Sequence, residues 1–346
     1  MITRFSNNTK IDDPDGSSPT WKKTNDPNDP VAYVKGSNIT MFSKITITPS
    51  LSSPISVNLR VKSGGSVIAT KDNISLSGSQ VNVTGITTSS PISNNAGLST
   101  PSFTWELSFD AGSTWSSIGT SGPHTLYWTY AVPIVPPFFS LSDVTYPEIY
   151  DLALEKSCGK IGNGTVVHDI CASISTAVAI DTHYDPNTLV GGHPLTVYSQ
   201  VSSYCLSNAL LLRGLLRTIG LDAQVIWVYA GLSNGTRELF TRNITPGVPT
   251  TPSFQIEVGQ NDNAEENPHF AFHAIVKCAQ DLDPLNYLDP SYGINYSKVG
   301  LEGKAIEVYT GGTPKIGLPT YVHMLRVAPT IWSSDSVKTD KCSHSF

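Results

Sequence analysis

Short runs of alternating apolar and polar residues fill the chain from about residue 31 to 132. Clusters of Ser, Gly, Asn and Pro, which favour turns, separate these runs. A period of two with frequent turns is typical of antiparallel strands that bury one face. We therefore predict an all-β sandwich over 31–132. The clearest runs are Ile45–Thr48, Val57–Val61, Val67–Ala69, Val81–Val83, Phe103–Leu107 and Leu126–Tyr130.

The aromatic residues of these runs admit two interpretations. The turn Asp110–Ser113 is expected to join the strands around Trp105 and Trp115. These two tryptophans, with Trp128 and Tyr130, could form a platform that binds a carbohydrate or a peptide. Large side chains that alternate along strands more often belong to the core, and we favour that interpretation.

The pattern changes at a stiff, Pro-rich stretch that cannot continue a central strand. Beyond it, 146–158 and 166–182 carry apolar residues at helical spacing, which predicts an α+β domain that begins with helices. The expected order is an irregular segment at 1–30, the sandwich at 31–132, a linker at 133–144, the α+β domain at 145–330 and a polar tail at 331–346.

Charge and hydropathy exclude several kinds of partner. The 346 residues carry a formal charge of -6 and no cluster of Lys and Arg, so nucleic acid is not expected. No stretch reaches the roughly 18 uncharged apolar residues that a membrane-spanning helix needs. The first residues lack the apolar centre of a secretory signal, which favours a cytoplasmic protein or one exported by a signal-independent route.

All five cysteines lie beyond residue 150, and an odd number leaves at least one thiol unpaired in the monomer. This low density suits a reducing compartment with free thiols, although a bridge between Cys158 and Cys171 stays open. Neither a calcium loop nor the paired spacing of a zinc site is present, so no metal or cofactor is expected.

The most informative segment runs from Tyr204 to Gly220 and is dense in apolar residues. It predicts a nearly buried helix that Ser202 or Ser203 caps and that Gly220 closes in a left-handed conformation. Cys205 then falls in the first turn, where free backbone amides and the helix dipole favour a thiolate. Because a single cysteine is more often a small buried hydrophobe, the rest of the domain has to decide its role.

Three strands are predicted after this helix, over 221–229, 270–277 and 286–289. The second strand carries His273, and the third ends at Asp289. A thiol, an imidazole and a carboxylate are the components of a nucleophile, a base and a group that orients the base.

His269 is the main rival of His273. On the same predicted strand, it would face the same side about 13 Å farther along, so only one of the two could reach Cys205. The shorter separation from Asp289 favours His273. Four other histidines, scattered singly along the chain, are expected at the surface or in satisfied polar positions. They are His168, His183, His193 and His323.

Around these residues the chain resembles the transglutaminase-like cysteine superfamily. The helix has the form C-x-x-x-A-x-L-L-x-x-L-L-R-x-x-G-[IL]-x-A, beginning at Cys205. A His-Ala step at His273 and an Asp-Pro-Ser step at Asp289 follow in the order typical of that superfamily. The resemblance covers about 145–300, and it implies a papain-like α+β domain behind an immunoglobulin-like sandwich.

By this resemblance, Cys205 is the nucleophile, His273 the general base and acid, and Asp289 the carboxylate that orients the imidazole. The thiolate would attack a carboxamide or peptide carbonyl of a protein or peptide substrate and form a thioester. Water as the acceptor would give proteolysis or glutamine deamidation, and an amine would give crosslinking.

Two functions stay open. The first is a bacterial-type thiol enzyme, such as an exported toxin, whose sandwich positions it or binds a protein or glycan target. The second is an adhesion or interaction protein with a catalytically dead scaffold, because Leu206 and Ile275 stand where many members of the superfamily have Trp. Residues 231–268 resemble an inserted loop in which substrate selection could reside.

Overall fold

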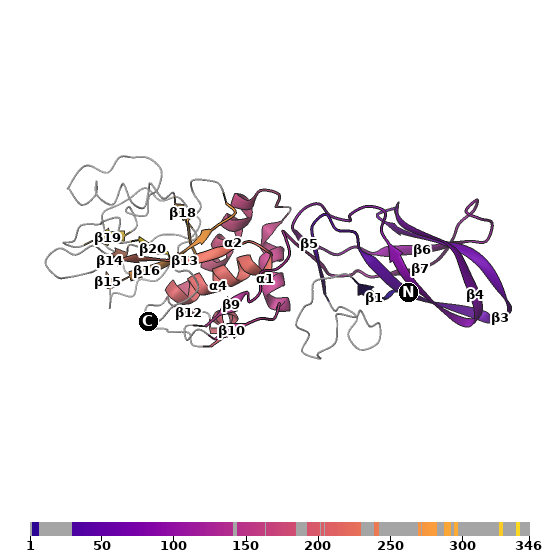
Figure 1. The fold of residues 1–346 in the computed structure, drawn as a ribbon, viewed down its shortest axis with the longest axis horizontal. Helices are drawn as coiled ribbons and strands as arrows, with labels where there is room; N and C mark the ends of the chain where they lie inside the picture. The colour runs from indigo at the N-terminus through magenta and orange to yellow at the C-terminus, as the bar shows by residue number, and fades with distance from the viewer. Residues whose placement is uncertain are drawn as a thin grey trace. The chain divides into compact units, whose positions relative to one another are not determined.

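The computed structural model describes fourteen stretches of the chain, coloured in Figure 1. They are 2–6, 30–140, 144–162, 164–184, 192–200, 202–203, 205–229, 239–241, 269–270, 272–281, 287–291, 294–296, 325–327 and 337–339. The chain divides into two compact units. One comprises Met1–Val132 with Ile149–Asn163, and the other Pro133–Glu148 with Gly164–Phe346.

The first unit is built mainly from two β-sheets. The five-stranded sheet contains β1 (Ile2–Ser6), β3 (Thr40–Ser63), β4 (Ser66–Thr87), β6 (Phe103–Ser108) and β7 (Ser116–Ser121). The three-stranded sheet contains β2 (Val31–Val34), β8 (Leu126–Thr129) and β5 (Gly97–Ser99).

Both sheets contribute side chains to one hydrophobic core. Met41 and Leu59 come from β3, and Tyr33 and Trp128 come from the smaller sheet; all four are almost fully buried. Two sheets over a shared core agree with the layered arrangement that the period of two indicated, while its immunoglobulin-like class stays a prediction. One pairing differs from the expected antiparallel pattern, because β2 and β8 run parallel.

The hairpin β3–β4 is much longer than the separate runs that the sequence predicted (Figure 1). Ser- and Pro-containing stretches that look like turns lie inside β3 instead. Its pairing with β4 shifts between Thr46 and Leu51 and again between Leu51 and Ile55, and Pro49 and Pro54 lie at these two irregularities. Proline lacks the N–H that a regular ladder needs, so a bulged strand accommodates it.

The predicted turn between β6 and β7 is confirmed, and Asp110 organises it. Its carboxylate accepts hydrogen bonds from Ser108 Oγ, from the Thr114 backbone N–H and from Thr114 Oγ1, at 2.7, 2.8 and 2.7 Å. The Thr114 contacts, with smaller help from Ser108, hold the pKa of Asp110 at about 2. Ala111 adopts a positive φ of 56° within the turn.

The four candidate platform aromatics divide into two kinds. Trp105 and Trp128 are 2% and 1% exposed and belong to the core, as we favoured. Trp115 and Tyr130 are partly exposed, and each lies beneath a cation: the guanidinium of Arg60 is 4.3 Å from the Trp115 ring centroid, and Lys35 Nζ is 3.7 Å from that of Tyr130.

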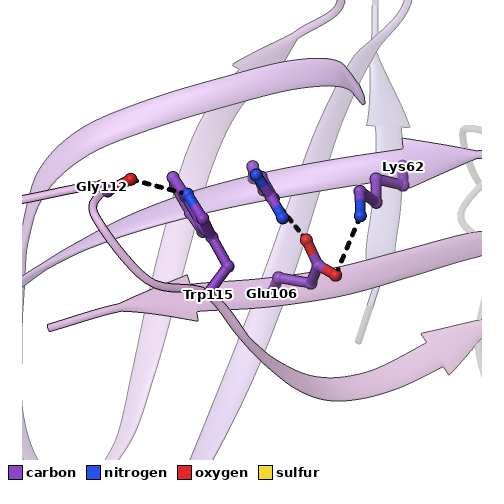
Figure 2. Close-up of polar contacts among 5 residues, drawn as sticks. Lys62, Glu106, Gly112 and Trp115 are labelled. Carbon is purple, nitrogen blue, oxygen red and sulfur yellow. Dashed lines mark hydrogen bonds and ion pairs between the residues drawn. The ribbon is translucent and has the colours of Figure 1, made fainter. Parts of the chain in front are cut away.

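A small charged network lies beside Trp115 in Figure 2. The Glu106 carboxylate pairs with Arg60 and, at 3.2 Å, with Lys62 Nζ. The Trp115 indole N–H donates to the backbone oxygen of Gly112 at 3.0 Å (Figure 2). The ring and the indole N–H of Trp115 therefore already contact Arg60 and Gly112 of the same chain.

Two terminal segments differ from their predictions. Ile2–Ser6, expected to be irregular, forms β1 and pairs with β3, burying Ile2 and Phe5. Val337–Thr339, expected in a flexible tail, forms β20 and pairs with β13. Both short strands gain hydrogen-bond partners from distant parts of the chain, which the local pattern does not reveal. Residues 7–29 lie outside the described residues.

Helix α1 (Asp151–Ile161) packs against β5 and β8 within the first unit, whereas the sequence analysis placed this stretch in the second domain. Tyr127 hydrogen-bonds Asp151, and the Cys158 thiol donates to the Trp128 backbone oxygen at 3.6 Å. Burial raises the pKa of Cys158 to about 12. This cysteine is therefore a free, buried thiol.

The second unit places helices against an antiparallel sheet. The helices are α2 (Val167–Asp181), the 3-10 turn η1 (Pro194–Thr196), α3 (Val197–Gln200) and α4 (Cys205–Thr218). The sheet order is β18 (Ile294–Tyr296), β17 (Tyr287–Asp289), β16 (Phe272–Cys278), β13 (Ala223–Tyr229) and β20. Helix α4 packs against β13 and β16, and α2 contacts α4, β17 and β18 (Figure 1). The helices and strands predicted here are present with small changes of bounds.

Smaller sheets complete the second unit. They pair β9 (Phe138–Phe139) with β10 (Thr145–Tyr146), β11 (His183–Tyr184) with β12 (Ser202–Ser203), and β14 (Leu239–Thr241) with β15 (His269–Phe270) and β19 (Leu325–Val327). Within the described stretches, no helix combines the length and apolarity needed to cross a bilayer.

The Pro-rich stretch after Val132 packs along α4. The Ile134 N–H donates to the Arg217 backbone oxygen at 2.9 Å, and Arg217 Nε donates to the Pro136 oxygen at 3.2 Å. Phe138 is fully buried against Gly214, where an added Cβ would lie 2.1 Å from the ring. This segment is thus part of the second unit's core.

Candidate functional site

Helix α4 begins at Cys205, as the sequence predicted for the candidate nucleophile. Ser202 and Ser203 belong to strand β12, so neither immediately precedes the helix. At the other end, the N–H groups of Gly220 and Leu221 donate to the Arg217 and Leu216 carbonyls at 3.0 Å each, and Gly220 has a φ of 83°. This Schellman cap confirms the predicted left-handed end.

Every residue of α4 except Leu210 is buried, including Cys205 at 0% exposure. Polar side chains on the helix are tied to neighbouring elements. Thr182 Oγ1, at the end of α2, donates to Asn208 Oδ1 at 3.2 Å. Arg217 Nη1 binds Asp222 Oδ1 at 2.8 Å. Such contacts offset the cost of burying polar groups and fix the helix in one position.

Helix α4 packs against β13 and against β16, the strand that carries position 273. Helix α4 is followed directly by β13, which runs back along it, and both elements are roughly 20 Å long by their ordinary rise. Val228, near the end of β13, pairs with His273 on β16. Strand β13 thus connects the helix that begins at Cys205 with the strand that carries His273.

Asp289 ends strand β17, next to β16, and is fully buried. The Ser291 backbone N–H donates to its Oδ1 at 3.0 Å. Lys277 pairs with Tyr287, so extending the register brings position 275 opposite Asp289. Positions 273 and 275 lie on the same face of the sheet as Asp289, because side chains alternate along a strand. The His273 side chain itself lies outside the described residues.

The same alternation sets a geometric constraint. Cys278 hydrogen-bonds Cys171 of α2, and it has the opposite alternation to position 273. Helix α4 contacts α2 as well as β16. Positions 273 and 278 lie on opposite faces of the sheet. If α4 lies on the face of Cys278, Cys205 can contact an imidazole at position 273 only around the edge of the sheet where β16 begins, at Phe272.

His269 does not lie on the strand of His273, contrary to our expectation. It belongs to β15, where it pairs with Phe240 of β14 in a different sheet. The comparison of two histidines on one continuous strand therefore does not apply. Among the other histidines, His168 is a satisfied polar residue, as expected, because its Nδ1 lies 3.0 Å from Asp281 Oδ2.

Residues 231–238 and 242–268 of the predicted inserted loop lie outside the described residues. In the stretches that the structure describes, no group of three or more His, Cys, Asp and Glu side chains is placed to hold a metal ion. The sequence analysis missed one feature of the unit, the contact between Cys171 and Cys278, because the spacing of two distant cysteines carries no signal for it.

The chain matches no protein-family model and no curated protein.

Proposed function

We propose that the protein is a thiol enzyme that acts on a carboxamide or peptide bond through Cys205, His273 and Asp289. One arrangement carries the proposal. A cysteine opens a buried helix that packs on β13 and β16, position 273 lies on β16, and a buried carboxylate ends the neighbouring strand. The transglutaminase-like sequence pattern around these positions supports the same roles.

In this proposal each group has one task. The Cys205 thiolate attacks the carbonyl carbon, and the His273 imidazole takes up the thiol proton and gives it to the leaving amine. Asp289 accepts a hydrogen bond from the imidazole and holds its tautomer. The backbone N–H at the start of α4 stabilises the developing oxyanion. The thioester is then released to water or to an amine.

The domain assignments belong to the same proposal. We assign the first unit to the immunoglobulin-like sandwiches and the second to the papain-like α+β domains. Two sheets over one core support the first assignment, and a Cys-bearing helix against an antiparallel sheet supports the second. We further propose that the first unit binds the protein or glycan target and that the substrate is a protein, as for a toxin that modifies host glutamines.

A second candidate function rests on the burial of Cys205, whose exposure is 0%. A sulfur that no substrate can reach would leave the second unit as a scaffold in an adhesion or interaction protein. Leu206 and Ile275, where many transglutaminase-like proteins have Trp, fit this alternative as well.

Alkylation kinetics separate the two functions. The reduced protein is treated with iodoacetamide between pH 5 and 9, and each cysteine is quantified by peptide mass spectrometry. An active site predicts rapid labelling of Cys205 well below pH 8.5, the approximate pKa of a free thiol, and loss of this labelling in His273→Ala. Cys158 is the internal control, because its pKa is about 12. Labelling of Cys205 only near pH 8.5 or above would favour the scaffold.

Product analysis then identifies the reaction. A glutamine-containing protein such as casein is incubated with the enzyme, with and without a primary amine. We expect an acyl adduct on Cys205 and either deamidated or amine-modified glutamine, both absent in Cys205→Ala. Peptide cleavage without glutamine modification would reassign the enzyme as a protease.

A further inference from the structure

Two buried cysteines from different elements meet in the second unit, apart from the proposed site. Cys171 lies on α2, Cys278 ends β16, and each has 0% exposure. Their thiols are hydrogen-bonded to one another. Both cysteines are free, so the pair is present as a dithiol.

A second contact connects the same helix to the same strand end. His168 precedes Cys171 by about one helical turn, and its Nδ1 lies 3.0 Å from Oδ2 of Asp281, which shortly follows Cys278. The Asp281 side chain is 2% exposed. This contact holds the segment of α2 that carries Cys171 beside the turn after Cys278. The sulfur contact is thus held by an independent interaction. Among the described residues, these four side chains are not arranged to hold a metal ion.

The environment of the pair divides the two sulfurs into a donor and an acceptor. Cys278 accepts a hydrogen bond from the Cys171 thiol and from the backbone N–H groups of Asp281 and Gln280, and these contacts lower its pKa. The pKa of Cys171 is raised, because its proton is held by Cys278 and because the thiol is buried. A sulfur with a lowered pKa beside a second thiol is the arrangement that thiol–disulfide exchange uses.

We propose that Cys171 and Cys278 form a reversible disulfide that links α2 covalently to β16. In the first step, the Cys278 thiolate attacks one sulfur of a small disulfide, forming a mixed disulfide and releasing one thiolate. Cys171 then loses its proton and attacks the Cys278 sulfur, which releases the second thiolate. The two cysteines lose two electrons and two protons in total, and the small disulfide is reduced to two thiols.

The bond would fix the helix that hydrogen-bonds α4 through Thr182 and Asn208. Oxidation is therefore expected to make the second unit more resistant to unfolding, because a long loop of the unfolded chain becomes closed. We expect the urea midpoint of this unit to rise on oxidation, and dithiothreitol to return it to that of the reduced protein.

The test uses the full-length reduced protein and hydroxyethyl disulfide, which is small and uncharged and so suits a buried site. After quenching with N-ethylmaleimide, a non-reducing peptide map should show a bond between Cys171 and Cys278 that dithiothreitol removes. Cys171→Ser should stop at a mixed disulfide on Cys278. Cys158→Ser is the matched control, because that thiol binds Trp128 in the first unit, and it should leave the bond unchanged.

Three results would overturn the proposal. One is a peptide map in which both cysteines are still alkylated after prolonged oxidation. Another is a bond from either cysteine to a third one, Cys205 or Cys342 included. The last is equal mixed-disulfide formation on all five cysteines, which would show no preference for the pair. Because the map is read from the wild-type protein, poor folding of a variant does not affect these outcomes.

Discussion

The two units bury different kinds of polar group. Among the described residues of the first unit, the buried polar ones are Ser, Thr and His124, and the charged network of Glu106, Arg60 and Lys62 lies in partly exposed positions. In the second unit the central helix α4 buries Asn208, Arg213 and other polar residues along with its leucines. Stability of the first unit should therefore depend on apolar packing, and that of the second on specific polar contacts and close backbone approach.

The largest effect that we expect comes from Gly214→Ala. An alanine on an exposed helix normally stabilises it by about 1 kcal/mol relative to glycine. Here the new Cβ would lie 2.1 Å from the buried Phe138 ring, so the second unit should instead lose about 3 kcal/mol in urea denaturation.

Gly159→Ala is the matched control for this change. Gly159 lies on α1 with nothing within 4 Å of an added Cβ, so the variant should be as stable as the wild type or more stable. The double variant Phe138→Leu with Gly214→Ala should recover part of the loss. If Gly214→Ala were stabilised as much as Gly159→Ala, α4 would not be packed against Phe138.

The next largest effect separates the units by pH. His124 is buried in the first unit, and desolvation lowers its pKa to about 4 from 6.5. As pH falls below 6.5, the unfolded chain takes up the proton first, so the first unit loses stability down to about pH 4 and shows no such effect above 6.5.

At pH 5 this loss should be about 2 kcal/mol, from the linkage between the two pKa values. Urea denaturation of the wild type and His124→Phe at pH 5 and 7.5 measures it. The phenylalanine variant should show a smaller difference between the two pH values. An unchanged difference would assign the pH dependence to other groups.

A smaller effect is expected from Arg217→Met in the second unit. The change keeps the apolar stem but removes the hydrogen bonds to Asp222 and to the Pro136 oxygen. We expect a loss of about 1.5 kcal/mol in urea denaturation, because hydrogen bonds from charged groups contribute about that much. Arg217→Lys should recover little, since lysine lacks the fork that reaches both partners. Full recovery with lysine would show that only the charge matters.

The smallest effect should come from Glu106→Gln in the first unit. Its partners Arg60 and Lys62 are partly exposed, and solvent and salt screen such pairs. The urea midpoint should change less than for any substitution above, and the change should disappear in 1 M NaCl. A loss as large as that of Arg217→Met, unaffected by salt, would remove the contrast between the units.

Local sequence signals predicted the elements that depend on local interactions. Helix α4 was predicted within two residues at its end, because its apolar density and Gly220 act through the helix itself. The turn at Asp110 was predicted for the same reason, since its hydrogen bonds span only a few residues. The order of Cys205, His273 and Asp289 also indicated that three distant segments belong to one domain.

What the sequence did not reveal depends on distant partners. Strands β1 and β20 are short, and they become strands by pairing with β3 and β13. Helix α1 has the period of a helix, but its pattern cannot show that it packs on β5 and β8. The pairing of Cys171 with Cys278 likewise depends on a tertiary arrangement.

The two units interleave along the chain, and this has a practical consequence for truncation. Pro133–Glu148 belongs to the second unit, although Ile149–Asn163 returns to the first. A fragment that starts at Gly164 would lack Phe138, which packs on Gly214 of α4. A fragment that stops at Val132 would lack α1, which packs on β5 and β8. No single truncation point leaves both units complete. To produce either unit alone, its two chain segments have to be joined by a linker or by circular permutation.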